Sequence, residues 1–316
     1  MTPPGVLCFG NLAVDTITGP LREPPLYGRT LWVDTLEQHG GGNGATTSFT
    51  LARFGVAVRL YGFCGRDAFG DFGVDRLRAE GVDVSWIERV DLPTSATVVL
   101  VDERGARAFL HRPGASSVAF DTVPDFTVEL VAGCTRFHLA NPFSMPHVRR
   151  NAPKMLTRAR AAGLRTSLDT GWDSRNEWMR VVGPCLPLLD LLFVNEDEAE
   201  RLTGCGDAVA AARALRDGGP RDVVIKLGGR GCLLSGEHGE DRIPGFAVKA
   251  VDTTGAGDVF AGAFLAGLQR GLSWRDAAVL ANAAGALSVS RVGATAGLLS
   301  FDETAEWASA RATNRA

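Results

Sequence analysis

Late in the chain, a polar turn, Asp252–Asp258, runs directly into an apolar segment rich in small residues, Val259–Leu265. Backbone N–H groups in the first turn of a helix lack internal acceptors, and together with the helix dipole they attract a phosphoryl group. Glycine on either side of Ala256 lets the backbone approach a ligand without a Cβ in the way. The segment therefore predicts a helix start that binds a phosphoryl group and has a carboxylate base, Asp258, beside it. The predicted anion-binding residues are Gly255, Ala256 and Gly257.

Other phosphate-binding or catalytic motifs are missing from the sequence. A Walker-type P-loop needs Gly-Lys-Ser/Thr, yet the three lysines follow Pro153, Ile225 and Val248. The first apolar strand leads into Gly10–Asp15 and not into the GxGxxG of a dinucleotide site. Neither a GxSxG elbow nor an HExxH pair occurs, which argues against hydrolase and zinc-protease chemistry. A phosphate site in this chain must therefore be made by the backbone.

Most of the chain alternates between short apolar strands and helical segments. The expected strands are Val6–Phe9, Arg136–Leu139, Thr166–Asp169, Leu191–Val194 and Val223–Leu227, with a hairpin near Cys232–Ser235 and Arg242–Phe246. The expected helices lie near Val148–Ala162, Arg175–Val182 and Ala208–Asp217, and others begin at Gly257 and Trp274. This alternation predicts an α/β fold with a doubly wound, mostly parallel central sheet flanked by helices. Ligands of such sheets bind at the carboxyl ends of the strands.

Two segments depart from the alternation. Residues 13–40 contain several prolines and a strand-like stretch, Thr30–Val33. Residues 93–112 show the pattern of a hairpin, with Ala96–Val101 and Arg107–His111 on either side of the polar turn Asp102–Gly105. We expect the two segments to pair into a small β lid. The predicted division is a body of residues 1–12, 41–92 and 113–316, and a lid of residues 13–40 and 93–112.

Composition excludes several classes of partner. The 316 residues carry a net charge of −3 and contain no basic run, so neither nucleic acid nor an anionic membrane is an expected partner. The six cysteines form no CxxC or Cys/His cluster, which predicts reduced thiols. The N-terminus lacks the basic start and long apolar stretch of a signal peptide. These features predict a soluble cytoplasmic protein.

The turn and helix start at Asp252–Asp258 match, position by position, the second signature of the ribokinase-like (PfkB) carbohydrate kinases. Gly40–Ala45, followed by Leu51–Gly55, resembles the first signature. Further landmarks follow in family order: Gly10–Asp15, Gly62–Gly70, Gly81–Asp83, Pro113–Ala115, Asn195–Glu198 and Lys226–Gly231. The resemblance covers nearly the whole chain. It implies a ribokinase-like fold and an ATP- and Mg²⁺-dependent kinase that phosphorylates a hydroxymethyl group of a sugar or sugar-derived small molecule, as a homodimer formed through the lid.

The resemblance also assigns roles to individual residues. Asp258 is the general base; a lone acid at a helix start could merely complement the dipole, but the full signature favours the base. Because phosphoryl transfer demands alignment more than basicity, a carboxylate of low pKa suffices. The implied acceptor-binding residues are Asp15, Gly41, Gly42, Asn43 and Thr46. Ribokinase-type sequences usually have Lys at 43 and Asn at 46, so Asn43 and Thr46 argue against ribose as the acceptor.

On the nucleotide side, the implied ATP-binding residues are Lys226, Gly228, Gly231 and Asn282. Asn195 and Glu198 would hold Mg²⁺ through water, although the NxxE spacing also fits an ordinary capped helix. Lys226 could equally extend to solvent from a strand end. Family members often bind a monovalent cation, and the resemblance implies K⁺ at Asp252 and Thr254. Gly297 replaces the serine that often closes this site, so the need for K⁺ stays open here.

Two alternatives to a sugar kinase remain at this stage. One is a nucleoside kinase of the adenosine type, which an aromatic clamp made by Trp32 and Phe109 would favour. The other is a non-catalytic regulator that binds a sugar or nucleotide on the same fold. The acceptor itself is also open, because His111 and Arg112 suit an acidic sugar. Relatives usually have Asp-Pro-Asn-x-Arg in the segment that begins at Asp169, and this departure leaves the acceptor or nucleotide assignment open as well.

Overall fold

The computed structural model describes residues 5–104, 106–237 and 239–312. The ends of the predicted body (residues 1–4 and 313–316) and Gly105 of the predicted lid turn lie outside the described residues. The body is built on one nine-stranded sheet of order β13-β12-β11-β10-β9-β8-β1-β4-β5. Its strands are β1 (Gly5–Phe9), β4 (Val58–Gly65), β5 (Ile87–Val90), β8 (Cys134–Ala140), β9 (Arg165–Asp169), β10 (Leu191–Asn195), β11 (Asp222–Lys226), β12 (Cys232–Gly236) and β13 (Gly239–Ile243).

In this sheet, all neighbouring strands from β5 to β11 run parallel, whereas β12 pairs antiparallel with both β11 and β13. The predicted doubly wound, mostly parallel sheet is thereby confirmed. The chain leaves β1 toward β4 and β5 on one side and later builds β8 to β13 on the other. The strand order thus reverses between β1 and β8, which is where a cleft opens at the carboxyl ends of such sheets.

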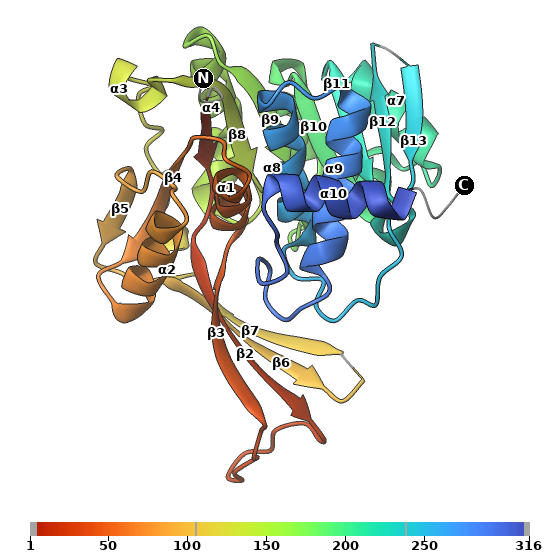
Figure 1. Ribbon diagram of the computed structural model, residues 1–316. Helices are drawn as coiled ribbons and strands as arrows, with labels where there is room; N and C mark the ends of the chain where they lie inside the picture. Colours follow the sequence, from red (N-terminus) through yellow and green to blue (C-terminus); the bar gives the residue numbers. More distant parts are fainter. Residues whose placement is uncertain (1–4, 105, 238, 313–316) are drawn as a thin grey trace.

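Helices cover both faces of the sheet (Figure 1). They are α1 (Asn43–Arg53), α2 (Ala68–Ala79), α3 (Val128–Val131), α4 (Pro146–Ala161), α5 (Met179–Val182), α6 (Glu196–Thr203), α7 (Ala208–Asp217), α8 (Ala256–Gln269), α9 (Trp274–Ser288) and α10 (Phe301–Ala312). Alternate residues of β1 belong to two separate cores: Leu7 and Phe9 lie in the core that also contains residues of α4, α6 and α7, whereas Val6 and Cys8 lie in the core that contains residues of α1, α8 and α9. Both faces of the sheet are therefore buried, as parallel strands require.

A second, four-stranded sheet of order β3-β2-β6-β7 projects from the body (Figure 1). It consists of β2 (Ala13–Leu21), β3 (Thr35–Gly41), β6 (Ser95–Asp102) and β7 (Arg107–Arg112). The two departing segments pair through the parallel contact of β2 with β6, which confirms the expected small β lid. The strand predicted at Thr30–Val33 is wrong, because the partner of β2 begins at Thr35, where the carbonyl of Gly19 accepts the Thr35 hydroxyl.

One predicted helix is also only partly right. Residues 175–178 precede α5 as a turn, because the Asp173 carboxylate accepts backbone N–H groups of Arg175, Glu177 and Trp178. Such a carboxylate offers the backbone an alternative to helical bonds. The helix starts only at Met179, and a 3₁₀ segment, Gly183–Leu188, continues it.

Candidate active site

A cavity of about 230 Å³ lies where the lid meets the body. Its wall contains all five expected acceptor residues: Asp15, Gly41, Gly42, Asn43 and Thr46. The lid contributes Thr97, Val99, Phe109 and His111, and the start of α8 contributes Thr254, Gly255 and Asp258. The fold therefore brings the predicted acceptor residues and the predicted base to one cavity.

Close packing explains the glycines at this cavity. A Cβ on Gly41 would collide with the carboxylate of Asp15 on the adjacent strand. Gly42, which caps the N-terminus of α1, has φ +93°, and a Cβ there would meet the carbonyl of Asn11 at 2.6 Å. Burial raises the pKa of Asp15, and a hydrogen bond with Thr97 opposes that rise. Asp15 thus presents a nearly enclosed carboxyl group to a ligand in the cavity.

Asp258 is held by a chain of amides. The side-chain amide of Asn43 donates to Oδ1 of Asp258 at 2.8 Å, and the amide of Asn141 donates to Oδ1 of Asn43 at 3.2 Å. Burial raises the pKa of Asp258 to about 6, against the opposing effects of Asn43 and Lys226. A carboxylate of low pKa would suffice for phosphoryl transfer, but the fold gives Asp258 a higher one. The Asp258 carboxylate remains mostly ionised at neutral pH, but it is a better proton acceptor than an exposed aspartate.

Helix α8 begins at the predicted turn. Gly255 caps it in the left-handed conformation, with φ +70°. Within the described part of the chain, the N–H groups of Gly255 and Gly257 have no protein acceptor, whereas the N–H of Ala256 donates to the carbonyl of Thr253 at 3.3 Å. Two donors at the positive end of the helix dipole are therefore available to an anion.

A second cavity of about 350 Å³ lies on the other side of the α8 start. It is lined by the four expected nucleotide residues, Lys226, Gly228, Gly231 and Asn282, and by apolar groups such as Phe246 and Val248. Two of the four also hold the cavity wall in place. The amide of Asn282 donates to the carbonyl of Ile243 at 3.2 Å, and a Cβ on Gly231 would collide with the same carbonyl.

A third cavity of about 300 Å³ is lined by Asp258 and by the last residues of β9, β10 and β11. Lys226 does not extend to solvent: its ammonium lies 2.6 and 2.9 Å from the two carboxylate oxygens of Asp169 and next to Gly257. Burial lowers the pKa of Lys226, but the nearby carboxylates of Asp169, Glu198 and Asp258 together outweigh this effect and raise the pKa overall, so the ammonium stays charged. Asp169 therefore positions a cation beside the helix start, a role that its departure from the family pattern left open.

Asn195 and Glu198 line the same cavity and also form a capping box. Oδ1 of Asn195 accepts the N–H of Glu198 at 2.8 Å, and Oε2 of Glu198 accepts the N–H of Asn195 at 2.9 Å and the Thr170 hydroxyl at 2.7 Å. The two residues thus cap α6 and border the site at once. Among the described residues, no three His, Cys, Asp or Glu side chains cluster as a metal-binding group.

The Asp252 carboxylate lies just before the α8 start and is 3% exposed. It accepts backbone N–H groups of Thr254 and Gly293, both at 2.8 Å, and contacts the guanidinium of Arg107 from β7 at 2.7 Å. Burial alone would raise its pKa, but those hydrogen bonds and the charge of Arg107 lower it. Sequence reasoning gave Arg107 no role.

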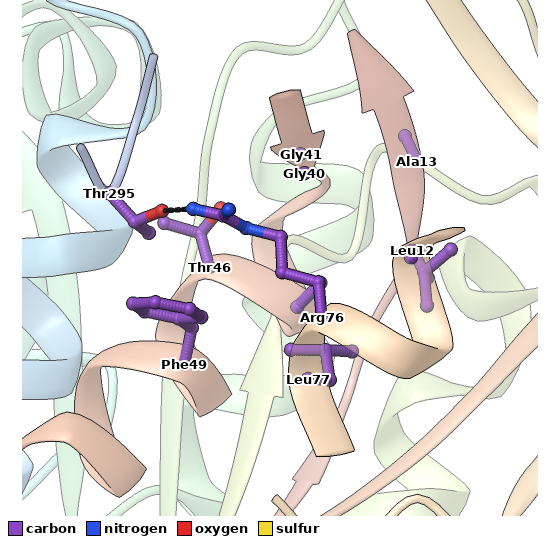
Figure 2. A pocket seen from close by; sticks show the side chains of 11 residues that line it. Leu12, Ala13, Gly40, Gly41, Thr46, Phe49, Arg76, Leu77 and Thr295 are labelled. Carbon is purple, nitrogen blue, oxygen red and sulfur yellow. Dashed lines mark hydrogen bonds between the residues drawn. The ribbon is translucent and has the colours of Figure 1, made fainter. Parts of the chain in front are cut away.

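Arg76 of α2 packs beside Gly40, at the end of β3 that leads into α1 (Figure 2). Its guanidinium lies over the Phe49 ring at 5.1 Å and donates to the Thr295 hydroxyl at 2.7 Å. It borders a hole of about 10 Å³ that shares Gly41 and Thr46 with the acceptor cavity. Arg76 therefore ties α2 to α1 and to the loop after α9.

Sequence reasoning also missed Asn11 and Asn141. Oδ1 of Asn11 accepts the backbone N–H of Asn43 at 2.9 Å, and Asn141 holds the Asn43 side chain. Asn141 comes directly after β8 and Asn11 two residues after β1, and the strand order reverses between these two strands. A search for amides after apolar strands could have found them.

No helix among the described residues has the length and apolar character needed to span a membrane. The family model described as pfkB family carbohydrate kinase matches residues 4–300. A ribokinase from Haemophilus influenzae is 28% identical over 95% of this chain and 96% of its own length. A fructokinase from Vibrio alginolyticus is 30% identical over 82% of this chain and 88% of its own. A crystal structure from E. coli, described as a ribokinase II in complex with ATP and Mg²⁺, superposes with a TM-score of 0.85 at 26% identity, covering 98% of this chain and 99% of its own.

Proposed function

The chain belongs to the pfkB family of carbohydrate kinases, and from that premise we propose that it uses ATP to phosphorylate a hydroxymethyl group of a neutral sugar or sugar-derived molecule. The observation that carries the proposal is the position of Asp258, which borders both the acceptor cavity and the cavity that reaches Lys226 and Glu198. A base at that junction lies between the two substrates.

In the proposed reaction, the acceptor hydroxyl oxygen attacks the γ-phosphorus of ATP and the bond to the β-phosphate oxygen breaks. Asp258 takes the hydroxyl proton as the new P–O bond forms. Asn43 keeps the carboxylate aimed at the cavity through its 2.8 Å hydrogen bond. The N–H groups of Gly255 and Gly257, together with the ammonium of Lys226, stabilise the negative charge on the transferring group.

The nucleotide is proposed to bind in the cavity beside Asn282, with its phosphates pointing toward Gly257. Asn195 and Glu198 would hold Mg²⁺ through water, and the oxygen-rich lining of the third cavity fits a hard cation. When bound, the metal supplies positive charge to the phosphate oxygens.

The acceptor is proposed to be uncharged. The cavity wall carries Asp15 and Asp258 and, among the described residues, no Lys or Arg. Arg112, a candidate for holding an acidic sugar, instead donates to the Thr94 carbonyl at 2.9 Å. Two carboxylates repel a sugar acid and accept hydrogen bonds from the hydroxyls of a neutral polyol.

Phe109 is the one feature that favours a nucleoside, since it lines the acceptor cavity, whereas Trp32 is 90% exposed and does not. A screen for ADP release with ATP and hexoses, ketoses, sugar acids, ribose and nucleosides separates these cases. We expect turnover with a neutral sugar. Turnover with nucleosides alone would support the alternative, and silence across the panel would support a non-catalytic regulator.

Replacing Asp258 by Asn tests the base directly. Asp258→Asn keeps the size and the contacts around the α8 start, so ATP should still bind while kcat falls by about 10²-fold or more. Nucleotide affinity is measured by calorimetry and kcat by ADP release. A variant that turns over within a factor of a few of the wild type would contradict the role.

The lid sheet is proposed to pair two copies of the chain into a homodimer. Its strands expose large apolar side chains, including Leu36, Val98 and Leu110. We assign residues 13–40 and 93–112 to the lid and the remainder to the body. Leu36, Val98 and Leu110 alternate with the lid residues that line the acceptor cavity, so pairing would cover the face of the lid that points away from the ligand.

A further inference from the structure

Arg107 makes the most extensive polar connection between the lid and the start of α8. Its guanidinium contacts Oδ1 of Asp252 at 2.7 Å, and donates to the Thr254 hydroxyl at 3.2 Å and to the Val251 carbonyl at 3.0 Å. The Arg107 side chain is only 14% exposed. One cation from β7 is thus surrounded by three oxygens of a single turn: a carboxylate, a hydroxyl and a carbonyl.

That turn leads directly into the anion-binding residues. Asp252 also accepts the N–H of Gly293, and the backbone N–H groups of Val251 and Asp252 donate to the Val289 carbonyl. The carboxylate is therefore fixed on three sides, and Gly255 follows it by three residues. The Arg107 guanidinium holds Asp252 and so helps to fix the direction in which the N–H groups at the α8 start point toward a phosphoryl group.

Asp252 and Thr254 are also the residues to which the family resemblance assigns a monovalent cation, and their surroundings do not fit that ion. Carboxylate, hydroxyl and carbonyl oxygens are donors that suit K⁺, but here all three face a guanidinium. A side chain at 297 cannot add a further oxygen, because a Cβ on Gly297 would collide with the Leu287 carbonyl. A metal ion added to the same oxygens would lie against a like charge.

We propose that the Arg107 guanidinium takes the place of a monovalent cation at the α8 start, so that the kinase needs no K⁺ and the lid carries the counter-charge of Asp252. The proposal rests on the proposed function only for its kinetic readout. It makes Arg107 a positioning residue, which acts on the transferring group through the turn at Asp252–Gly255. It also couples the two substrates, because the strand that bears Arg107 also bears Phe109 and His111 of the acceptor cavity.

The test compares wild type, Arg107→Met and a control, Arg22→Met, which removes an 86% exposed arginine of the lid. Melting temperatures and kcat are measured in KCl, NaCl and tetramethylammonium chloride. We expect the wild type and R22M to show no K⁺-specific effect in either measurement. R107M should lose roughly tenfold or more of kcat in tetramethylammonium, regain much of it in KCl, and gain a K⁺-specific rise in melting temperature.

Several outcomes would overturn the proposal. A wild-type enzyme that K⁺ specifically accelerates and stabilises still has a cation site. A folded R107M with unchanged kcat, or one that stays slow and gains no thermal stability in K⁺, shows that Arg107 does not stand in for the ion. The wild-type measurements decide the matter even if R107M fails to fold. Since melting temperature requires no turnover, failure of this proposal is distinguishable from failure of the kinase assignment.

Discussion

At the scale of single residues, the site combines a half-buried carboxylate, Asp258, with a neutral hydrogen-bond partner. Asp258 receives one amide hydrogen bond, from Asn43, and its cationic neighbour Lys226 is already paired with Asp169. Burial therefore dominates and raises the pKa of Asp258 to about 6. The carboxylate of Glu198 adds to this rise, whereas Asn43 and Lys226 limit it.

This environment predicts the pH dependence of turnover. A general base works only when it is ionised, so kcat/KM should be level above about pH 7 and fall about tenfold per pH unit once the pH drops below the pKa of Asp258. The measurement is kcat/KM for the acceptor at saturating ATP, from about pH 4.5 to about pH 8.5. A profile that stays level down to about pH 4.5 would assign Asp258 the pKa of an exposed aspartate.

Removing the Asn43 side chain should shift the acidic limb of the pH profile of kcat/KM to higher pH. Asn43→Ala deletes the hydrogen bond that favours the ionised carboxylate, so the pKa of Asp258 rises and the limb shifts to higher pH. Thr47→Val is the matched control, because the Thr47 hydroxyl bonds the backbone carbonyl of Asp258 and not its carboxylate. The same pH profile for N43A and T47V would argue against control of the base by Asn43.

At the scale of elements, α8 depends on glycine for its packing as well as for its anion-binding turn. A Cβ on Gly262 would meet Cβ of Thr50 at 2.8 Å and the Thr47 carbonyl at 2.9 Å, so α8 lies directly against α1. A Cβ on Gly267 would meet Ala277 of α9 at 3.0 Å. Because α1 carries Asn43 and α8 carries Asp258, this close contact sets the distance between the amide and the base.

Two alanine substitutions separate packing from helix propensity. Gly262→Ala should lower the free energy of unfolding by about 1–3 kcal/mol, since neither α1 nor α8 has room for a methyl group. Gly285→Ala in α9 meets only the Ala256 carbonyl at 3.9 Å and should stabilise the protein by about 0.5–1 kcal/mol. Urea unfolding without ligands measures both. If Gly262→Ala and Gly285→Ala change the free energy of unfolding equally, the contact between α1 and α8 is not tight.

Local patterns were enough to predict much of the fold, but not the contacts that join distant segments. The bounds of α7 and the strand–helix alternation follow from apolar periodicity, and the lid hairpin follows from its polar turn. The turn at residues 175–178 and the late start of β3 depend on hydrogen bonds of Asp173 and Thr35. The pairing of Asp252 with Arg107 joins residues 145 positions apart, and no local spacing reveals it.

At the scale of the whole molecule, the acceptor cavity is completed by a sheet that also exposes an apolar surface. Thr97, Val99, Phe109 and His111 line the cavity from the lid, while Leu110 of the same strand as Phe109 is 63% exposed. Successive side chains of a strand point to opposite faces, so one face of β7 borders the cavity and the other carries the exposed Leu110.

The proposed lid dimer predicts the mass in solution. Wild type should sediment as two chains, and Leu110→Glu should sediment as one, because a buried carboxylate opposes pairing of the lids. Val128→Glu is the matched control, since Val128 on α3 of the body is also exposed. A wild type that sediments as a single chain at all concentrations would contradict the dimer, as would equal masses for L110E and wild type.

Among the described residues, the cavity proposed for the nucleotide is lined from Lys226 onward, whereas the cavity proposed for the acceptor takes most of its wall from residues before Arg112. Under the proposed function, the choice of sugar and the choice of phosphate donor therefore depend largely on different parts of the chain. Substitutions before Arg112 can therefore reshape the first cavity while every residue that lines the second stays the same.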